Sequence, residues 1–164
     1  MIDMVTKKMI KKNLLSFIII TLVFVTDRVT KYVILELSET SDNFDITITS
    51  FLNFNLLWNN GIAFGLLQFK QSFYYNLITL VIFVITLIII WLAYKSKGLE
   101  KICYLMIIGG AFGNLFDRVY YGSVIDFIDI SIKNFHWFIF NVADIFISIG
   151  ILILIILEFV KKKS

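Results

Sequence analysis

The stretch FYYNLITLVIFVITLIIIWLAY, residues 73–94, contains no charged side chain. A run of about 20 apolar residues is long enough to cross a hydrocarbon core of roughly 30 Å as a helix. Three further runs have this character, at residues 14–35, 102–120 and 141–160. A helix satisfies its own backbone hydrogen bonds within lipid, so we predict an all-α membrane protein with four transmembrane helices.

The composition of the whole chain agrees with a membrane protein. Of its 164 residues, 59% are hydrophobic and 16% are charged, and the mean hydropathy is +0.89. Soluble domains carry about 25% charged residues. We therefore expect a single integral membrane domain over residues 1–164. Its one cysteine, Cys103, excludes an intramolecular disulfide.

The lysines are concentrated in three places: residues 7–12, 95–101 and 161–163. Basic residues favour the cytoplasmic side of a membrane, so both termini and the second connection are expected in the cytoplasm. The connections near residues 38–72 and 121–140 then face outward. The net charge of +3 is explained by this orientation, and no nucleic-acid partner is expected.

The first outer connection has the periodicity of β-strands. Residues 44–49 alternate apolar and polar side chains, and residues 51–57 continue the pattern in part. This predicts a small extracytoplasmic β-sheet between the first and second helices, with Asn59-Asn60-Gly61 as its turn or exit.

Several polar residues are predicted to lie at one depth in the membrane. Counting about 1.5 Å per residue outward from the cytoplasmic lysines places Asp27, Asp117 and Asp144 at about 22 to 25 Å. Asp126 follows Asp117 closely enough to fold back to this layer. Carboxylates near lipid are costly, which favours a functional site. Other polar residues in or close to the layer are Lys31, Asn114, Arg118 and Asn141.

Structural explanations compete with function for two of these pairs. Asp27 and Lys31 are four residues apart on a helix, a spacing at which opposite charges neutralise each other. Asp117 and Arg118 equally fit the end of a helix at the interface, with the arginine reaching toward headgroups.

Capping and packing are further alternatives. Asn141 and Asp144 fit the N-cap and third position of a helix, where an acidic side chain is stabilised. Asp129 fits a solvated loop charge, and His136, the one histidine of the chain, has no second His or Cys nearby with which to form a zinc site. A small-residue surface for helix packing would account for Gly109, Gly110 and Gly113.

A pair of close aspartates has a specific chemistry. Both cannot ionise easily, so they share a proton, one acting as a base and the other as an acid. The base activates water for attack on a peptide carbonyl, and no nucleophilic serine, cofactor or metal is needed. Neighbouring groups such as Asn114, Asn141 or Arg118 would orient the pair or stabilise developing charge.

Five motifs occur in order along the chain: DRVTK (27–31), NNGIAFG (59–65), GGAFGNLFDRV (109–119), VIDF (124–127) and FNVAD (140–144). They resemble the successive motifs of lipoprotein signal peptidase, also called signal peptidase II. The likeness extends from about residue 17 to residue 157.

The resemblance implies an aspartyl protease of the bacterial inner membrane, active near the outer face, with Asp126 and Asp144 as the catalytic dyad. Its substrates are prolipoproteins whose lipobox cysteine carries a diacylglyceryl group, and cleavage falls just before that cysteine. Membrane lipids are the other expected partners, and we expect a monomer. The family also places a small sheet and a mobile segment between helices one and two. Positions that match its substrate-positioning or dyad-supporting residues are Asp27, Lys31, Asn59, Gly61, Gly110, Asn114, Arg118 and Asn141.

Two positions depart from the usual motifs. Arg28 stands where glutamine is common, and Phe138 stands where a proline often precedes the asparagine motif. Neither is a proposed catalytic group.

Two other functions fit intramembrane acids. A proton-coupled transporter would spread acids through the membrane, whereas the inner two thirds of the four predicted spans lack them. A metal-dependent transferase acting on a lipid phosphate would hold a divalent cation through the aspartates, and sensitivity to EDTA would distinguish it.

Overall fold

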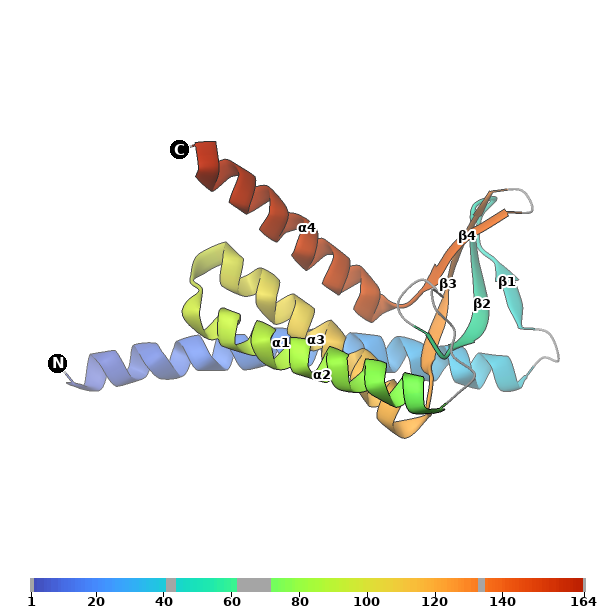
Figure 1. The fold of residues 1–164 in the computed structure, drawn as a ribbon, viewed down its shortest axis with the longest axis horizontal. Helices are drawn as coiled ribbons and strands as arrows, with labels where there is room; N and C mark the ends of the chain where they lie inside the picture. Colours follow the sequence, from blue (N-terminus) through green and yellow to red (C-terminus); the bar gives the residue numbers. More distant parts are fainter. Residues whose placement is uncertain (1, 41–43, 62–71, 133–134, 164) are drawn as a thin grey trace.

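A computed structural model describes residues 2–40, 44–61, 72–132 and 135–163 of the chain. Four helices carry most of it: α1 (Ile2–Glu39), α2 (Ser72–Lys95), α3 (Gly98–Tyr120) and α4 (Val142–Lys163). Both termini lie at one end of the helices, and a sheet lies at the other end (Figure 1). The mobile segment expected between the first two helices falls partly on residues 41–43 and 62–71, which are outside the described residues.

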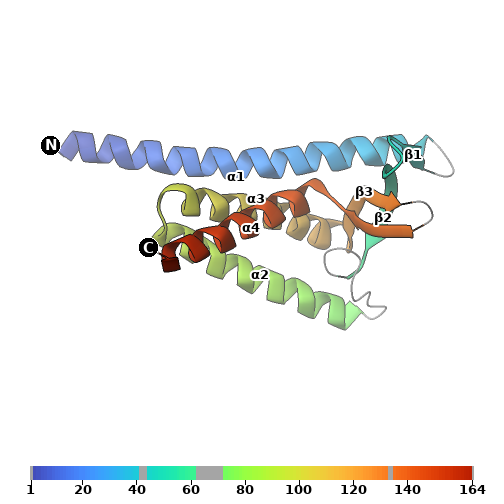
Figure 2. The same ribbon diagram turned by 90° about the horizontal axis from the view of Figure 1, so that it is seen from above.

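Helix α3 is central, with contacts to α1, α2 and α4. Figure 2 shows α1 along one side of the bundle and α2 along the other. Close approach requires glycines on α3. A Cβ atom on Gly109 would lie 2.7 Å from the Cβ of Val23 in α1, and one on Gly110 would lie 2.6 Å from the carbonyl oxygen of Ala143 in α4. The packing role considered for these glycines is therefore confirmed.

Within the described residues, three helical segments are long and apolar enough to cross a membrane: Phe73–Lys95, Gly98–Tyr120 and Val142–Lys162. They match three of the four predicted runs. The remaining predicted run, residues 14–35, lies inside α1 and is helical throughout.

The sheet is larger than predicted. Strands β1 (Asp45–Thr47) and β2 (Leu52–Asn59) confirm the alternation of the first connection. Strands β3 (Val124–Ile132) and β4 (Phe135–Phe140) come from the connection between α3 and α4, and the antiparallel order is β1-β2-β3-β4. Placing the whole sheet between the first two helices was wrong, because β3 pairs with both β2 and β4 as an inner strand.

Two predictions about exposed charges are corrected by this arrangement. Asp129 is fully buried on β3, where its Oδ2 lies 2.6 Å from Nδ1 of His136, so it is no solvated loop charge. Asp117 and Arg118 are also buried at the end of α3. Arg118 donates to the carbonyl oxygen of Gly61 and lies against the ring of Tyr75, so it does not reach toward headgroups.

Candidate active site

Asp126 from β3 and Asp144 from α4 line one cavity of about 360 Å³. Both side chains are buried. The cavity lies among α2, α3, α4 and the adjoining strands, and three more of the predicted site residues line it: Asn59, Asn114 and Arg118. Segments distant in sequence therefore meet around the two carboxylates.

Asp126 is held by two side-chain amides. Asn59 donates to its Oδ2 at 2.7 Å, and Asn141 donates to its Oδ1 at 2.6 Å. Burial, and secondarily the negative charge of Asp144, raises the pKa of Asp126 to about 7, although both amides oppose the rise. Near neutral pH this carboxyl group is therefore divided between its acid and its base form.

Asp144 sits in the first turn of α4, where it forms a reciprocal cap with Asn141. The backbone N–H of Asp144 donates to Oδ1 of Asn141 at 3.0 Å, and the backbone N–H of Asn141 donates to Oδ2 of Asp144 at 3.3 Å. The capping explanation considered for this pair is thus confirmed. Asn114 donates to the other oxygen of Asp144 at 2.8 Å. Asn141 consequently contacts both acids, one through each half of its amide.

Asp27 and Lys31 of α1 form the expected ion pair at 3.0 Å. Both are nonetheless buried, and each has a further partner. Oδ1 of Asp27 accepts from the backbone N–H of Ala143 at 3.0 Å, and Nζ of Lys31 donates to Oδ1 of Asn114 at 3.0 Å. These further contacts connect α1 to the residues beside Asp144. Mutual neutralisation of Asp27 and Lys31 therefore does not account for all the contacts of the pair.

The remaining predicted site residues are Gly61, Arg118 and Gly110, and they do not all lie at the cavity. The backbone N–H of Gly61 donates to Oδ1 of Asn59 at 2.8 Å, and its carbonyl accepts from Nη2 of Arg118. The guanidinium of Arg118 also lies 5.1 Å from the ring centre of Tyr75. Gly110 does not line the cavity; it lets α4 approach α3.

Asp117 and Arg28 belong to the polar network but were not predicted as site residues. Asp117 accepts from Nζ of Lys31 at 2.7 Å and from Nη1 of Arg28 at 2.5 Å. A signal for Asp117 was present in the sequence, since helical rise placed it in the same layer as Asp27 and Asp144. For Arg28 the signal was only its position beside Asp27.

Comparison with known proteins identifies the family. The family model described as "Signal peptidase (SPase) II" matches residues 19–160. This chain belongs to the signal peptidase II family. The lipoprotein signal peptidase of Pelagibacter ubique is 48% identical over 157 residues, which cover 94% of this chain and 95% of that protein. The one from Francisella tularensis subsp. novicida is 38% identical, with coverage of 95% and 99%.

Two solved structures share the fold of this signal peptidase II. Each is described as a bacterial membrane enzyme. The first has a TM-score of 0.73 and 33% identity, with 91% of this chain and 89% of that chain covered. The second has a TM-score of 0.70 and 32% identity, with coverage of 89% and 92%. The resemblance found in the motifs is confirmed, and the chain is a peptidase that removes signal peptides from prolipoproteins.

Proposed function

We propose that Asp126 and Asp144 are the general acid–base dyad of an aspartyl endopeptidase. Its substrate is a prolipoprotein with a diacylglyceryl-modified cysteine, and it cleaves the peptide bond before that cysteine. The observation that carries the proposal is the shared cavity, in which Asn141 donates to both buried carboxylates, to Asp126 from its side-chain amide and to Asp144 from its backbone N–H.

The surroundings of the two acids suggest their separate roles. Asp144 accepts hydrogen bonds from Asn114 and from the backbone of Asn141, and it lies at a helix N-terminus, where a negative charge is stabilised. We assign it as the base. Asp126, whose pKa is raised to about 7, is assigned as the acid.

In the proposed reaction Asp144 takes a proton from water as the water oxygen bonds to the scissile carbonyl carbon. Asp126 gives its proton to the carbonyl oxygen, which yields a neutral tetrahedral diol. The C–N bond then breaks, the amine nitrogen receives the proton held by Asp144, and a diol proton returns to Asp126 as the acid product forms. The dyad ends in its starting protonation state.

The remaining site residues are proposed to hold the dyad and the substrate. Asn59 and Asn141 orient Asp126, while Asn114 orients Asp144. The Nε and Nη1 atoms of Arg118 are buried and have no hydrogen-bond partner among the described residues. Arg118 lines the cavity, so these donors are suited to a carbonyl oxygen of the substrate.

The proposed setting is the bacterial inner membrane. One monomeric peptidase domain would cross it four times, with α1 as the additional span, both termini cytoplasmic and the sheet outside. The position of both termini opposite the sheet supports this topology (Figure 1). A substrate whose acyl chains lie in the outer leaflet would present its scissile bond near the cavity. The cavity's apolar side chains would then contact the signal-peptide helix: Ile82, Ile147 and Ile151.

A gel-shift assay tests this function. Purified protein in detergent is incubated with a prolipoprotein that carries the diacylglyceryl group, with and without EDTA. We expect cleavage at equal rates in both samples and no cleavage of the unlipidated precursor. Loss of cleavage in EDTA that Mg²⁺ restores would contradict the metal-free dyad mechanism.

The activity is also expected to depend on pH in a defined direction. If protonated Asp126 is the acid, kcat/KM should fall as pH rises through about 7, because the group then loses its proton. The Asn59→Ala variant removes a hydrogen bond that lowers the pKa of Asp126. In this variant the fall of kcat/KM with rising pH should therefore occur at higher pH. A fall that stays in place or moves to lower pH would contradict the assignment of Asp126.

A further inference from the structure

Four charged side chains form a buried cluster beside the dyad, which we call the charged quartet: Asp27, Arg28, Lys31 and Asp117. Its two carboxylates come from different helices, α1 and α3. Its formal charges sum to zero. None of the four lines the cavity that holds Asp126 and Asp144.

Each carboxylate of the charged quartet holds the backbone directly before one member of the dyad. Oδ1 of Asp27 accepts from the N–H of Ala143 at 3.0 Å, and Ala143 precedes Asp144. Oδ2 of Asp117 accepts from the N–H of Ile125 at 3.3 Å, and Ile125 precedes Asp126. The separation of Asp27 from Asp117 therefore contributes to the separation of the two dyad residues.

Arg28 is one of two cations that bridge these carboxylates. Its Nη1 lies 2.5 Å from Oδ1 of Asp117, and its Nη2 lies 2.7 Å from Oδ2 of Asp27. A planar guanidinium fixes the angle between two such bonds, whereas the ammonium of Lys31 is a point charge. Lys31 bridges the same pair at 3.0 and 2.7 Å.

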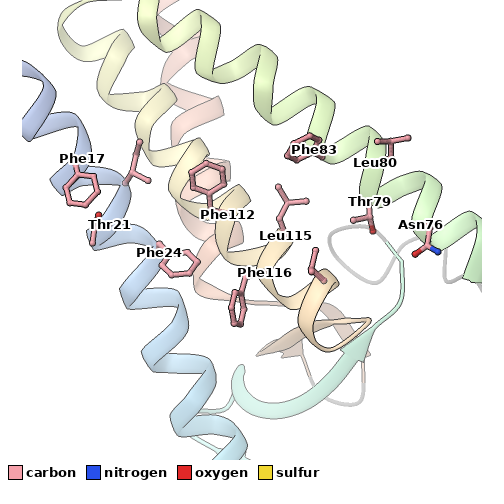
Figure 3. Close-up of a pocket in the computed structure, with 12 residues that line it drawn as sticks. Phe17, Thr21, Phe24, Asn76, Thr79, Leu80, Phe83, Phe112, Leu115 and Phe116 are labelled. Atoms are coloured by element: carbon pink, nitrogen blue, oxygen red, sulfur yellow. The ribbon is translucent and has the colours of Figure 1, made fainter.

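The guanidinium of Arg28 also packs against two aromatic rings. Its central carbon lies 4.8 Å from the ring centre of Phe116 and 5.9 Å from that of Phe24. The two phenylalanines approach each other from α3 and α1 at an apolar groove shared with α2 (Figure 3). The side chain of Arg28 is 17% exposed. Its position is therefore defined by contacts with two acids and two aromatic rings.

We propose that Arg28 is a positioning residue for the peptidase reaction. By joining Asp27 to Asp117, it sets the distance between the backbone that carries Asp144 and the backbone that carries Asp126. It touches neither the substrate cavity nor the reacting atoms, so it acts on the rate of the chemical step and leaves substrate binding unchanged. The inference rests on the proposed dyad.

The test compares Arg28→Met and Arg28→Lys with the unmodified protein in the prolipoprotein cleavage assay. Arg28→Met keeps an apolar side chain against Phe116 and removes the bonds of Arg28 to Asp27 and Asp117. We expect kcat to fall about tenfold with KM unchanged, since small misplacements of reacting groups cost up to about a hundredfold in rate. Arg28→Lys keeps the positive charge but lacks the planar guanidinium that fixes the angle between the two bonds. This variant should therefore recover part of the kcat that Arg28→Met loses.

Two controls accompany these variants. Lys95→Met removes a cation 5.6 Å from the ring centre of Trp91 at the other end of the bundle and should leave both constants unchanged. Asp144→Asn tests the dyad itself. If Asp144→Asn is inactive while Arg28→Met, measured per folded molecule, keeps normal kcat or changes only KM, the inference about Arg28 fails and the dyad stands. Turnover by Asp144→Asn would overturn the dyad and the inference with it.

A folding defect would not leave the inference undecided. Should Arg28→Met fail to fold in detergent, Arg28→Lys decides between the two roles. A reduced kcat at unchanged KM in the folded lysine variant supports positioning. A kcat equal to that of the unmodified protein overturns it.

Discussion

Replacement of Asp126 or Asp144 by asparagine is expected to reduce turnover of diacylglyceryl-modified prolipoprotein by about a thousandfold or more. General acid–base catalysis contributes about 10²- to 10⁴-fold to a rate, and an amide can neither take up nor release the proton. Asparagine has nearly the shape of aspartate and keeps one acceptor oxygen, which can pair with one of the donors that face each carboxylate. Folding in detergent should therefore survive, as judged by tryptophan fluorescence and elution volume.

Asp129→Asn is the matched control for these variants. Asp129 is buried on the same strand as Asp126, but it does not line the cavity, and its partner is His136. Its asparagine variant should keep turnover within a few-fold of the unmodified protein. Near-normal turnover by folded Asp126→Asn or Asp144→Asn would show that the dyad is assigned wrongly.

The Lys31→Met variant is expected to lose about 3 kcal/mol of stability, because breaking a buried ion pair leaves an uncompensated charge. The side chain of Lys31 is 1% exposed and contacts two fully buried carboxylates. With methionine, the two acids share only Arg28. Equilibrium unfolding of the purified protein by SDS in mixed micelles, followed by tryptophan fluorescence, measures the change.

Lys161→Met provides the comparison for Lys31→Met. Lys161 also forms an ion pair, with Glu100, but at the opposite end of the helices and with its side chain 58% exposed. Exposed pairs contribute little, so the unfolding midpoint should not move measurably. Equal stability losses in the two variants would contradict the importance of burial for the contacts of Lys31.

The helices could be predicted well from the sequence, and the sheet only in part. Long apolar runs predict transmembrane helices directly, whereas strand β3 was not predicted from the sequence. Asp126 and Asp129 are three residues apart, so they point to opposite faces of this strand. Both are buried, as are Ile125 and Phe127, so this part of β3 is covered on both faces. Residues 124–127 accordingly show no apolar and polar alternation, whereas residues 128–132 do alternate, a strand signal that was present in the sequence and was not used.

Helical rise predicted the depth of the polar residues but not their partners. It brought Asp27, Asp117 and Asp144 into one layer, in which the structure joins Asp27 and Asp117 through shared cations and places Asp27 on the backbone beside Asp144. Which residues contact each other depends on how the helices are rotated and packed. That packing is decided by close approaches such as the one at Gly113, where a Cβ atom would lie 2.5 Å from Oδ2 of Asp27.

The first turn of α4 links the activity of the enzyme to the folding of the whole bundle. Asn141 bonds to Asp126 through its amide nitrogen and to the backbone of Asp144 through its amide oxygen. Asn141 and Ala143 are fully buried, and the N–H of Ala143 donates to Asp27 of α1. Helix ends that open at low free-energy cost have few buried contacts, and this end has many. Heat should therefore separate the two acids only as it melts the bundle, so activity and fold should be lost in one transition.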